Sequence, residues 1–228
     1  AYNYHKQMVG SGSAWSTSDG QQMLWDAERT PVTMIAYAPF MSEATPDASL
    51  TVNALTNQST EENVKSSDFL LMKATVDPEQ DLTADGKLKI SLNHAMSKLI
   101  IKITVNGTTD ASMSKLGDMA INGAVVNATC DLSAAAPVVV PAADAVVATV
   151  APYKGTESCE CILPPQKIAE GFSVNFSYDG KLYIWTAKEA IELEKGVEHT
   201  LTLNVNTTVR LAAKMARNWA TGQLIDRN

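Results

Sequence analysis

The sequence predicts an all-β protein of sandwich architecture, divided into two domains of similar size. Short segments of alternating apolar and polar residues recur along the 228-residue chain, turn residues separate them, and helical periodicity is scarce. A small, polar, turn-rich stretch at 106–115 (NGTTDASMSK) lies near the middle of the chain. It predicts a boundary between a domain at residues 1–106 and a domain at residues 107–228, each of the usual size for a small domain.

The first half of the chain contains four segments with strand character. Each is short, and Pro39, Asp77-Pro78 and Asp85-Gly86 end or separate them. The four predicted strands are Thr33–Ala38, Ser49–Asn53, Asp68–Val76 and Lys87–Leu92.

The segment Ser91–Ile103 (SLNHAMSKLIIKI) changes its hydrophobic phase. His94 and Met96 share one parity, and the later apolar residues, such as Ile101, take the other. Since alternate residues of a strand face opposite sides, the change predicts a bulge or bend where the chain passes between two packing environments. We expect His94 to be a buried, hydrogen-bonded structural histidine, uncharged at neutral pH.

In the second half, FSVNFSYDGKLYIWTA predicts a hairpin turning at Asp179-Gly180, because Asp-Gly suits a turn with two positive φ angles. Lys195-Gly196 predicts a second turn, between Ala190–Leu193 and His199–Val205.

Two segments are less regular. Ala134–Ala151 is rich in Ala, Val and Pro, and its prolines predict an edge strand or crossing loop and then a strand near Val146–Val150. With one charge, it is also a candidate contact surface. Val209–Trp219 suits a helix or a strand, and we favour a strand for its first half.

Composition excludes several functions. The net charge of -7 and pI of about 5.0 argue against binding to nucleic acid or to anionic lipid head groups. No apolar run reaches membrane-spanning length. The chain begins at Ala1 rather than Met, as expected if an export segment has been removed.

No catalytic or cofactor-binding motif is present, so we expect neither an enzyme nor a cofactor. Three cysteines allow two interpretations: Cys130 bridged to Cys159 or Cys161 in an oxidising compartment, or three small buried side chains. We expect no metal site, because the three histidines are scattered and zinc requires four nitrogen or sulfur ligands. Trp15, Trp25 and the tyrosines leave an alternative open, a glycan-binding β-sandwich with an aromatic platform.

Several segments, in order, resemble those of the fimbrillin family, the surface and pilus proteins of Bacteroidetes. SLNHAMSKLIIKI resembles the family's His-Ala-x-Ser-Lys-Leu strand, and VEHTLTLNV a later strand that usually has Tyr where His199 stands. MARNWATG resembles the Ile-x-x-Trp-x-x-Gly ending, with Met215 for Ile and Trp219 at the tryptophan. Two further segments agree, TMIAYAPF and SSDFLLMKATV.

The resemblance implies two tandem transthyretin-like β-sandwiches and a non-enzymatic role in adhesion or surface fibres. It also implies export as an outer-membrane lipoprotein, with the lipid anchor on an N-terminus missing from this chain. Partners would be other fimbrial subunits, held by β-strand donation, and a host or bacterial surface ligand. Pilin members lose an N-terminal strand by cleavage after an arginine, and Arg29, in DAERTPVTM, is the candidate position here.

Overall fold

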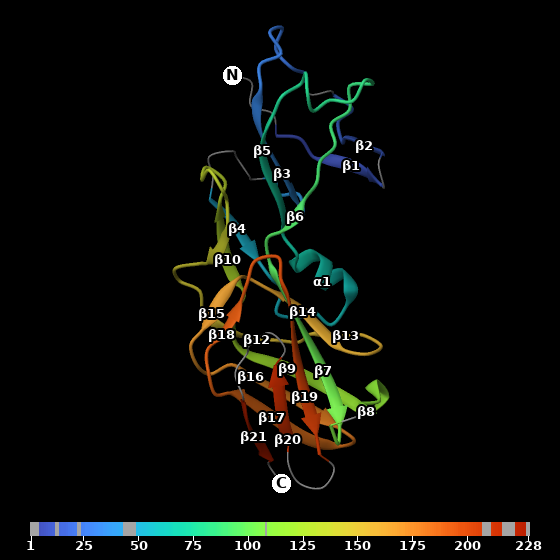
Figure 1. The fold of residues 1–228 in the computed structure, drawn as a ribbon, viewed down its shortest axis with the longest axis vertical. Coiled ribbons are helices and arrows are strands. Elements are labelled where there is room, and N and C mark those ends of the chain that lie inside the picture. Colours follow the sequence, from blue (N-terminus) through green and yellow to red (C-terminus); the bar gives the residue numbers. More distant parts are fainter. Residues whose placement is uncertain are drawn as a thin grey trace.

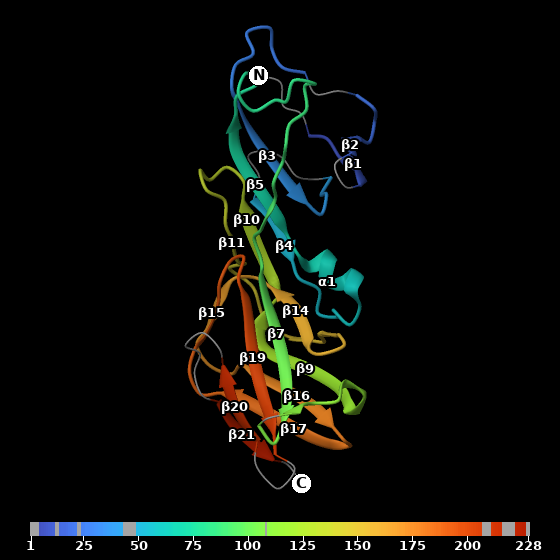
Figure 2. The same ribbon diagram turned by 45° about the vertical axis from the view of Figure 1, so that its right-hand side comes forward.

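The protein is an elongated β-structure with one α-helix among the residues described (Figures 1 and 2). The all-β prediction is therefore confirmed. The computed structural model describes residues 5–11, 14–21, 24–42, 49–107, 109–206, 211–215 and 222–226.

Two large sheets form a β-sandwich at one end of the long axis, called here the large sandwich (Figure 1). The five-stranded sheet runs in the order β12 (Val147–Val150), β9 (Leu116–Val125), β16 (Ser173–Tyr178), β17 (Lys181–Ala187) and β21 (Gly222–Asp226). The other sheet runs in the order β13 (Tyr153–Lys154), β14 (Cys159–Leu163), β7 (Ser97–Val105), β19 (Glu198–Val205) and β20 (Leu211–Met215), with β8 (Thr109–Asp110) also on β7.

The core of the large sandwich lies between these sheets, because the inward side of each strand is apolar. Trp185 on β17 is fully buried and meets Phe172 edge-on, with ring centroids 6.1 Å apart. Leu99 and Ile101 on β7, and Leu201 on β19, belong to the same cluster. Alternate residues point the same way in a strand, so one sequence parity supplies the buried face.

The other end of the molecule, called here the small region, consists of three small sheets. β1 (Met8–Ser11) pairs with β2 (Ala14–Thr17). A second sheet has the order β3 (Val32–Ala38), β5 (Leu70–Val76) and β6 (Asn93–His94). The third has the order β11 (Val139–Pro141), β10 (Asn127–Asp131) and β4 (Ser49–Asn53). Lys73 links the last two sheets, since its ammonium donates to the carbonyls of Leu132, Ser133 and Ala134.

Between the two ends lie the helix α1 (Glu61–Ser67) and a sheet of β15 (Gln166–Ile168) with β18 (Ile191–Leu193) (Figure 1). A 3-10 turn (Met113–Lys115) precedes β9. Sequence reasoning missed α1. Its signal was Thr60, whose side chain accepts from Asn63 N–H as the N-cap, followed by two acidic residues in the first turn.

Backbone pairing crosses residue 106 in both directions. β7 precedes that residue and pairs with β14 and β19, which follow it. Conversely, β10 follows it and pairs with β4, which precedes it. A cut at residue 106 would separate strands from their hydrogen-bonded neighbours, so the two ends of the molecule are not the sequence intervals 1–106 and 107–228.

The change of hydrophobic phase coincides with a change of sheet. β6 pairs with β5 in the small region, while β7 pairs with β14 and β19 in the large sandwich. Ala95, Met96 and Ser97 are all buried at the crossing, where strict alternation breaks down. The predicted passage between two packing environments is confirmed.

The predicted hairpin is confirmed. The predicted second turn, at Lys195-Gly196, is also present, but the segments on its two sides do not pair with each other. β16 and β17 pair across Asp179 (φ 50°) and Gly180 (φ 78°), as a turn with two positive φ angles requires. β18 and β19, however, join different sheets. β18 pairs with β15, and β19 lies parallel to β7.

Candidate functional site

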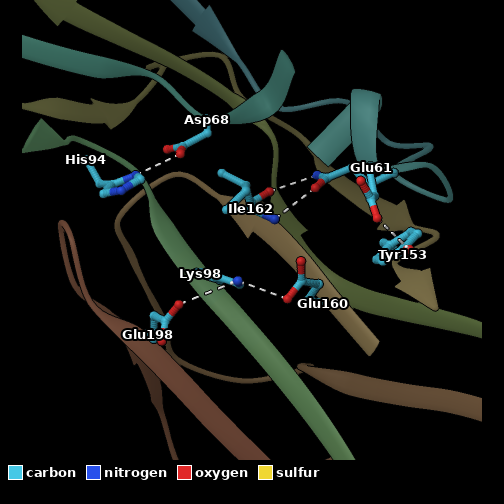
Figure 3. Close-up of polar contacts among 9 residues, drawn as sticks. Glu61, Asp68, His94, Lys98, Tyr153, Glu160, Ile162 and Glu198 are labelled. Atoms are coloured by element: carbon cyan, nitrogen blue, oxygen red, sulfur yellow. Dashed lines mark hydrogen bonds and ion pairs between the residues drawn. The ribbon is translucent and has the colours of Figure 1, made fainter. Parts of the chain in front are cut away.

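A groove of about 490 Å³ lies where α1 meets the outer face of the large sandwich. We call it the waist groove. Its polar side chains come from α1, β6, β7, β13, β14 and β19 and from Asp68 just after α1, and Figure 3 shows several of them pairing with one another. Its polar lining consists of Glu61, Lys65, Asp68, His94, Ser97, Lys98, Tyr153, Glu160 and Glu198.

Lys98 is the central cation of the waist groove. Its ammonium lies 2.9 Å from the Glu160 carboxylate on β14 and 3.5 Å from that of Glu198 on β19 (Figure 3). Burial lowers the pKa of Lys98, but the hydrogen bond and charge of Glu160, aided by Glu198, outweigh burial and raise it. Lys98 therefore stays charged and cross-links three neighbouring strands on their outer face.

Two polar contacts attach flanking elements to this sheet. The Tyr153 hydroxyl on β13 lies 3.1 Å from the Glu61 carboxylate on α1, and this hydrogen bond raises the pKa of Tyr153. His94 Nδ1 on β6 lies 2.7 Å from Asp68 Oδ2, just after α1 (Figure 3). These pairs tie α1 to the large sandwich at one side and to β6 at the other.

Gln58 makes the deepest polar contact of the waist. Its side chain is fully buried, and its amide pairs with Ile162 of β14 in both directions, accepting from N–H at 2.8 Å and donating to C=O at 2.8 Å. The Gln58 amide also donates to Leu55 C=O. One glutamine thus takes the place of a strand residue at the edge of β14 and joins the chain after β4 to the large sandwich.

The structure contradicts the predicted burial of His94. Its side chain is 65% exposed and faces Asp68 at the rim of the waist groove. The buried histidine is His199 on β19, whose Nε2 accepts a hydrogen bond from Glu194 N–H at 3.0 Å. His199 shares parity with Leu201, Leu203 and Val205, which is the signal that could have identified it.

All three cysteines are buried free thiols in the structure, in line with the second interpretation from sequence. Cys159 and Cys161 lie on β14 opposite Ile101 and Leu99 of β7, and Cys130 lies on β10 opposite Leu50 of β4. Burial raises the pKa of all three, that of Cys159 to about 11.

Of the two predicted residues nearest the chain ends, Arg29 lies within the described structure and Trp219 does not. Arg29 is exposed, has a positive φ of 53°, and lies in the turn before β3, with its guanidinium donating to Pro78 C=O. Trp219 lies outside the described residues.

The described tryptophans occupy three different environments. Trp185 is in the core, Trp25 donates to Thr30 C=O near the start of β3, and Trp15 is 57% exposed on β2. Burial of Trp185 removes that ring from the surface residues available to the glycan-binding alternative.

Within the described ranges, no group of three or more His, Cys, Asp or Glu side chains is placed to hold a metal ion. Over the same ranges, no helix is both long and apolar enough to cross a membrane. Most charged side chains of the waist groove pair with each other, and these pairs connect strands of the large sandwich, α1 and β6.

The chain belongs to the fimbrillin-like family, which it matches over residues 1–218. The family resemblance seen in the sequence is confirmed. A search of curated proteins found no match.

Solved structures share the fold at low sequence identity. A candidate cell adhesion protein of Bacteroides uniformis has a TM-score of 0.70 at 17% identity, covering 94% of this chain and 85% of its own. A candidate cell adhesion protein of Bacteroides ovatus has a TM-score of 0.61 at 17% identity, covering 96% and 73%. A fimbrial protein of Bacteroides ovatus has a TM-score of 0.53 at 16% identity, covering 90% of this chain and 42% of its own. These neighbours show the shared fold, and membership of the fimbrillin-like family supports a fimbrial adhesion role.

Proposed function

We propose that this protein is a non-enzymatic fimbrial subunit that assembles by donating a terminal β-strand to a neighbouring subunit. The observation that carries the proposal is the position of its last two described strands. β20 is the outermost strand of one sheet of the large sandwich, beside β19, and β21 is the outermost strand of the other, beside β17. Either can leave by breaking its pairing with one neighbouring strand, without disturbing the pairings among the other strands of its sheet.

The donor sequence has the required chemistry. From Val209 to Met215 the residues of one parity are Val209, Leu211, Ala213 and Met215, all apolar. A strand with one apolar face can pair through its backbone and also cover an apolar surface of another subunit.

The acceptor we propose is the outer edge of β3. Within the described ranges β3 pairs only with β5, so one edge of a seven-residue strand has no strand partner there. Its apolar side chains, among them Ile35 and Tyr37, are only partly buried. A free edge with incompletely covered apolar residues is a template for an added strand.

The proposal includes cleavage after Arg29, but its effect would differ from the removal of a strand from a sheet. β1 and β2 pair with each other, so removing the residues before Thr30 would not withdraw either strand from the sheet of β3. It would remove His5, whose Nε2 lies 2.7 Å from Tyr37 Oη and whose ring stacks on Phe40. Cleavage would thus uncover the end of β3.

The family also motivates the remaining elements of the proposal. The precursor would be exported and anchored to the outer membrane as a lipoprotein, and its partners would be other fimbrial subunits and a surface ligand. No cofactor is required.

Light scattering on four proteins tests the mechanism: the intact chain, a chain that begins at Thr30, Arg29→Ala treated with an arginine-specific protease, and a chain that ends at Asn206. We expect the chain beginning at Thr30 to assemble, and the chain ending at Asn206 to remain monomeric after cleavage. Protease-treated Arg29→Ala should assemble much less than the treated intact chain.

Because β20 and β21 are strands of the large sandwich and their loss also alters that sandwich, a peptide of residues 207–219 provides a second test. The peptide should inhibit assembly of the chain that begins at Thr30, and a peptide of the same composition in scrambled order should not. Assembly that persists without residues 207–228 and ignores the peptide would contradict strand donation by this segment.

A further inference from the structure

Residues 87–92 lie beside β5 without pairing with it. The β5–β6 ladder contains only Leu70 with His94 and Leu71 with Asn93, and the chain before Asn93 is not part of a described strand. Yet KLKISL has the strict alternation from which a strand at Lys87–Leu92 is predicted. This disagreement between sequence and structure is confined to the far half of β5.

Extending the β5–β6 register gives a consistent set of partners. The side chains on one face would be apolar on both strands, and those on the other face would be polar on both. The apolar pairs are Met72 with Leu92, Ala74 with Ile90 and Val76 with Leu88, and the polar pairs are Lys73 with Ser91 and Thr75 with Lys89. A shift of one residue would place apolar side chains opposite polar ones along the whole segment.

The space between the two segments is a cleft of about 380 Å³. Its lining includes Met72, Ala74, Val76 and Leu88, four of the six residues on the apolar face. Ile90 is 41% exposed. Pairing would bring apolar side chains together across the cleft, and burial of apolar surface favours this closure.

Both ends of the unpaired segment are already held. At one end β6 continues it onto β5. At the other, Leu88 bridges to Leu82, Thr83 N–H donates to Lys87 C=O, and Lys87 N–H donates to the Thr83 hydroxyl. The segment is therefore a strap fixed at both ends and in register with β5 at its β6 end, so closure needs no long loop to be ordered.

We propose that Leu88–Leu92 closes onto β5 as a strand, in the register that β6 begins, and that the structure shows the strap open. Closure removes the cleft and gives β5 a partner along most of its length. It also extends β6 into a strand from Leu88 to His94 that leads directly into β7, so a stiff segment of chain spans the waist. This inference does not depend on the proposed function.

Disulfide trapping tests the register. Ala95 N–H donates to Phe69 C=O at 2.8 Å, which makes residues 69 and 95 a hydrogen-bonded pair and makes 74 and 90 a non-hydrogen-bonded pair. Such pairs have Cα atoms about 4.5 Å apart, within reach of a disulfide. Ala74→Cys with Ile90→Cys should cross-link almost completely under mild oxidation, as mapped by peptide mass spectrometry.

The matched control shifts the second cysteine by one residue. Ala74→Cys with Lys89→Cys places the two side chains on opposite faces in the closed register and should remain mainly as thiols. Equal cross-linking of the two pairs, or none in either, would overturn the proposal. The native cysteines are buried, and mass mapping separates them from the introduced pair.

Amide hydrogen exchange on the unmodified chain gives an independent measurement. In the closed register the N–H groups of Lys89 and Ser91 point toward β5, while that of Ile90 points away. Lys89 and Ser91 should then exchange at least tenfold more slowly than Ile90. Equally fast exchange at all three amides would show that the strap stays open.

Discussion

β19 (EHTLTLNV) and β3 (VTMIAYA) are strands of similar length and very different burial, and only β19 alternates strictly between polar and apolar residues. In β19 every second residue from His199 to Val205 is buried, whereas no residue of β3 is fully buried. β19 lies between β7 and β20, and a second sheet covers its inner face; β3 is at the edge of a three-stranded sheet. Alternation therefore specifies which face of a strand is apolar, and burial depends on a neighbour that covers it.

The largest expected difference between the regions concerns apolar truncation. Trp185→Ala removes a fully buried ring from the large sandwich and should lower the free energy of unfolding by about 4 kcal/mol. Ile35→Ala on β3 removes a partly buried side chain and should cost about 1 kcal/mol. Urea unfolding followed by circular dichroism measures both, and similar losses would refute the contrast.

Glycine substitution should separate the regions next. Gly123 on β9 has a φ of 90°, and a Cβ there would lie 2.5 Å from Gly171 O, so Gly123→Ala should cost about 3 kcal/mol. Gly86 in the small region has a φ of 76° with nothing within 4 Å of such a Cβ, so Gly86→Ala should cost about 1 kcal/mol. In thermal denaturation, the midpoint temperature of Gly123→Ala should be well below that of Gly86→Ala.

A smaller loss of stability is expected when a glutamine whose amide hydrogen-bonds to a strand backbone is replaced by alanine. Gln58 is buried, so Gln58→Ala leaves Ile162 N–H and C=O without partners or water, at a cost of about 2 kcal/mol. Gln166 pairs with Val125 N–H and C=O in the same two-way manner but is only partly buried. Water can replace its amide, and Gln166→Ala should cost about 0.5 kcal/mol. Chemical denaturation measures both losses of stability, and a larger loss for Gln166→Ala than for Gln58→Ala would contradict this explanation.

The smallest effect is kinetic and concerns the thiols. Burial holds the pKa of Cys159 at about 11 and raises those of Cys130 and Cys161, so native protein at pH 8 should react slowly with iodoacetamide. Cys130, on β10 in the small region, should react before Cys159 and Cys161 if that region opens at lower cost. Mass spectrometry of timed samples gives the order, and denatured protein should show three free thiols.

Sequence reasoning succeeded where local chemistry decides the structure. The Asp179-Gly180 hairpin was predictable because a two-residue turn fixes both register and partner. Pro137 and Pro141 likewise limited β11 to an edge. The parallel pairing of β7 with β19 was beyond such reasoning, because the two strands are far apart in sequence and no turn connects them.

The candidate site was less predictable than the fold. Lys98, Glu160 and Glu198 alternate with buried residues on three strands, and only the order of those strands in the sheet brings their charges together. His94 was misassigned because its parity matches Met96, although the chain changes sheets between them. The family resemblance could be read from short motifs because their order along the chain is independent of strand pairing.

The parallel pairing of β7 and β19 has a mechanical consequence. Both strands run along the long axis of the molecule (Figures 1 and 2), and they pair from Lys98 with Glu198 to Val105 with Val205. Tension between the two ends of the molecule would act nearly parallel to this ladder, so its eight residue pairs would be loaded in shear together rather than peeled apart in turn. A ladder loaded in shear must break many hydrogen bonds at once, which makes this pair of strands the element best placed to resist stretching.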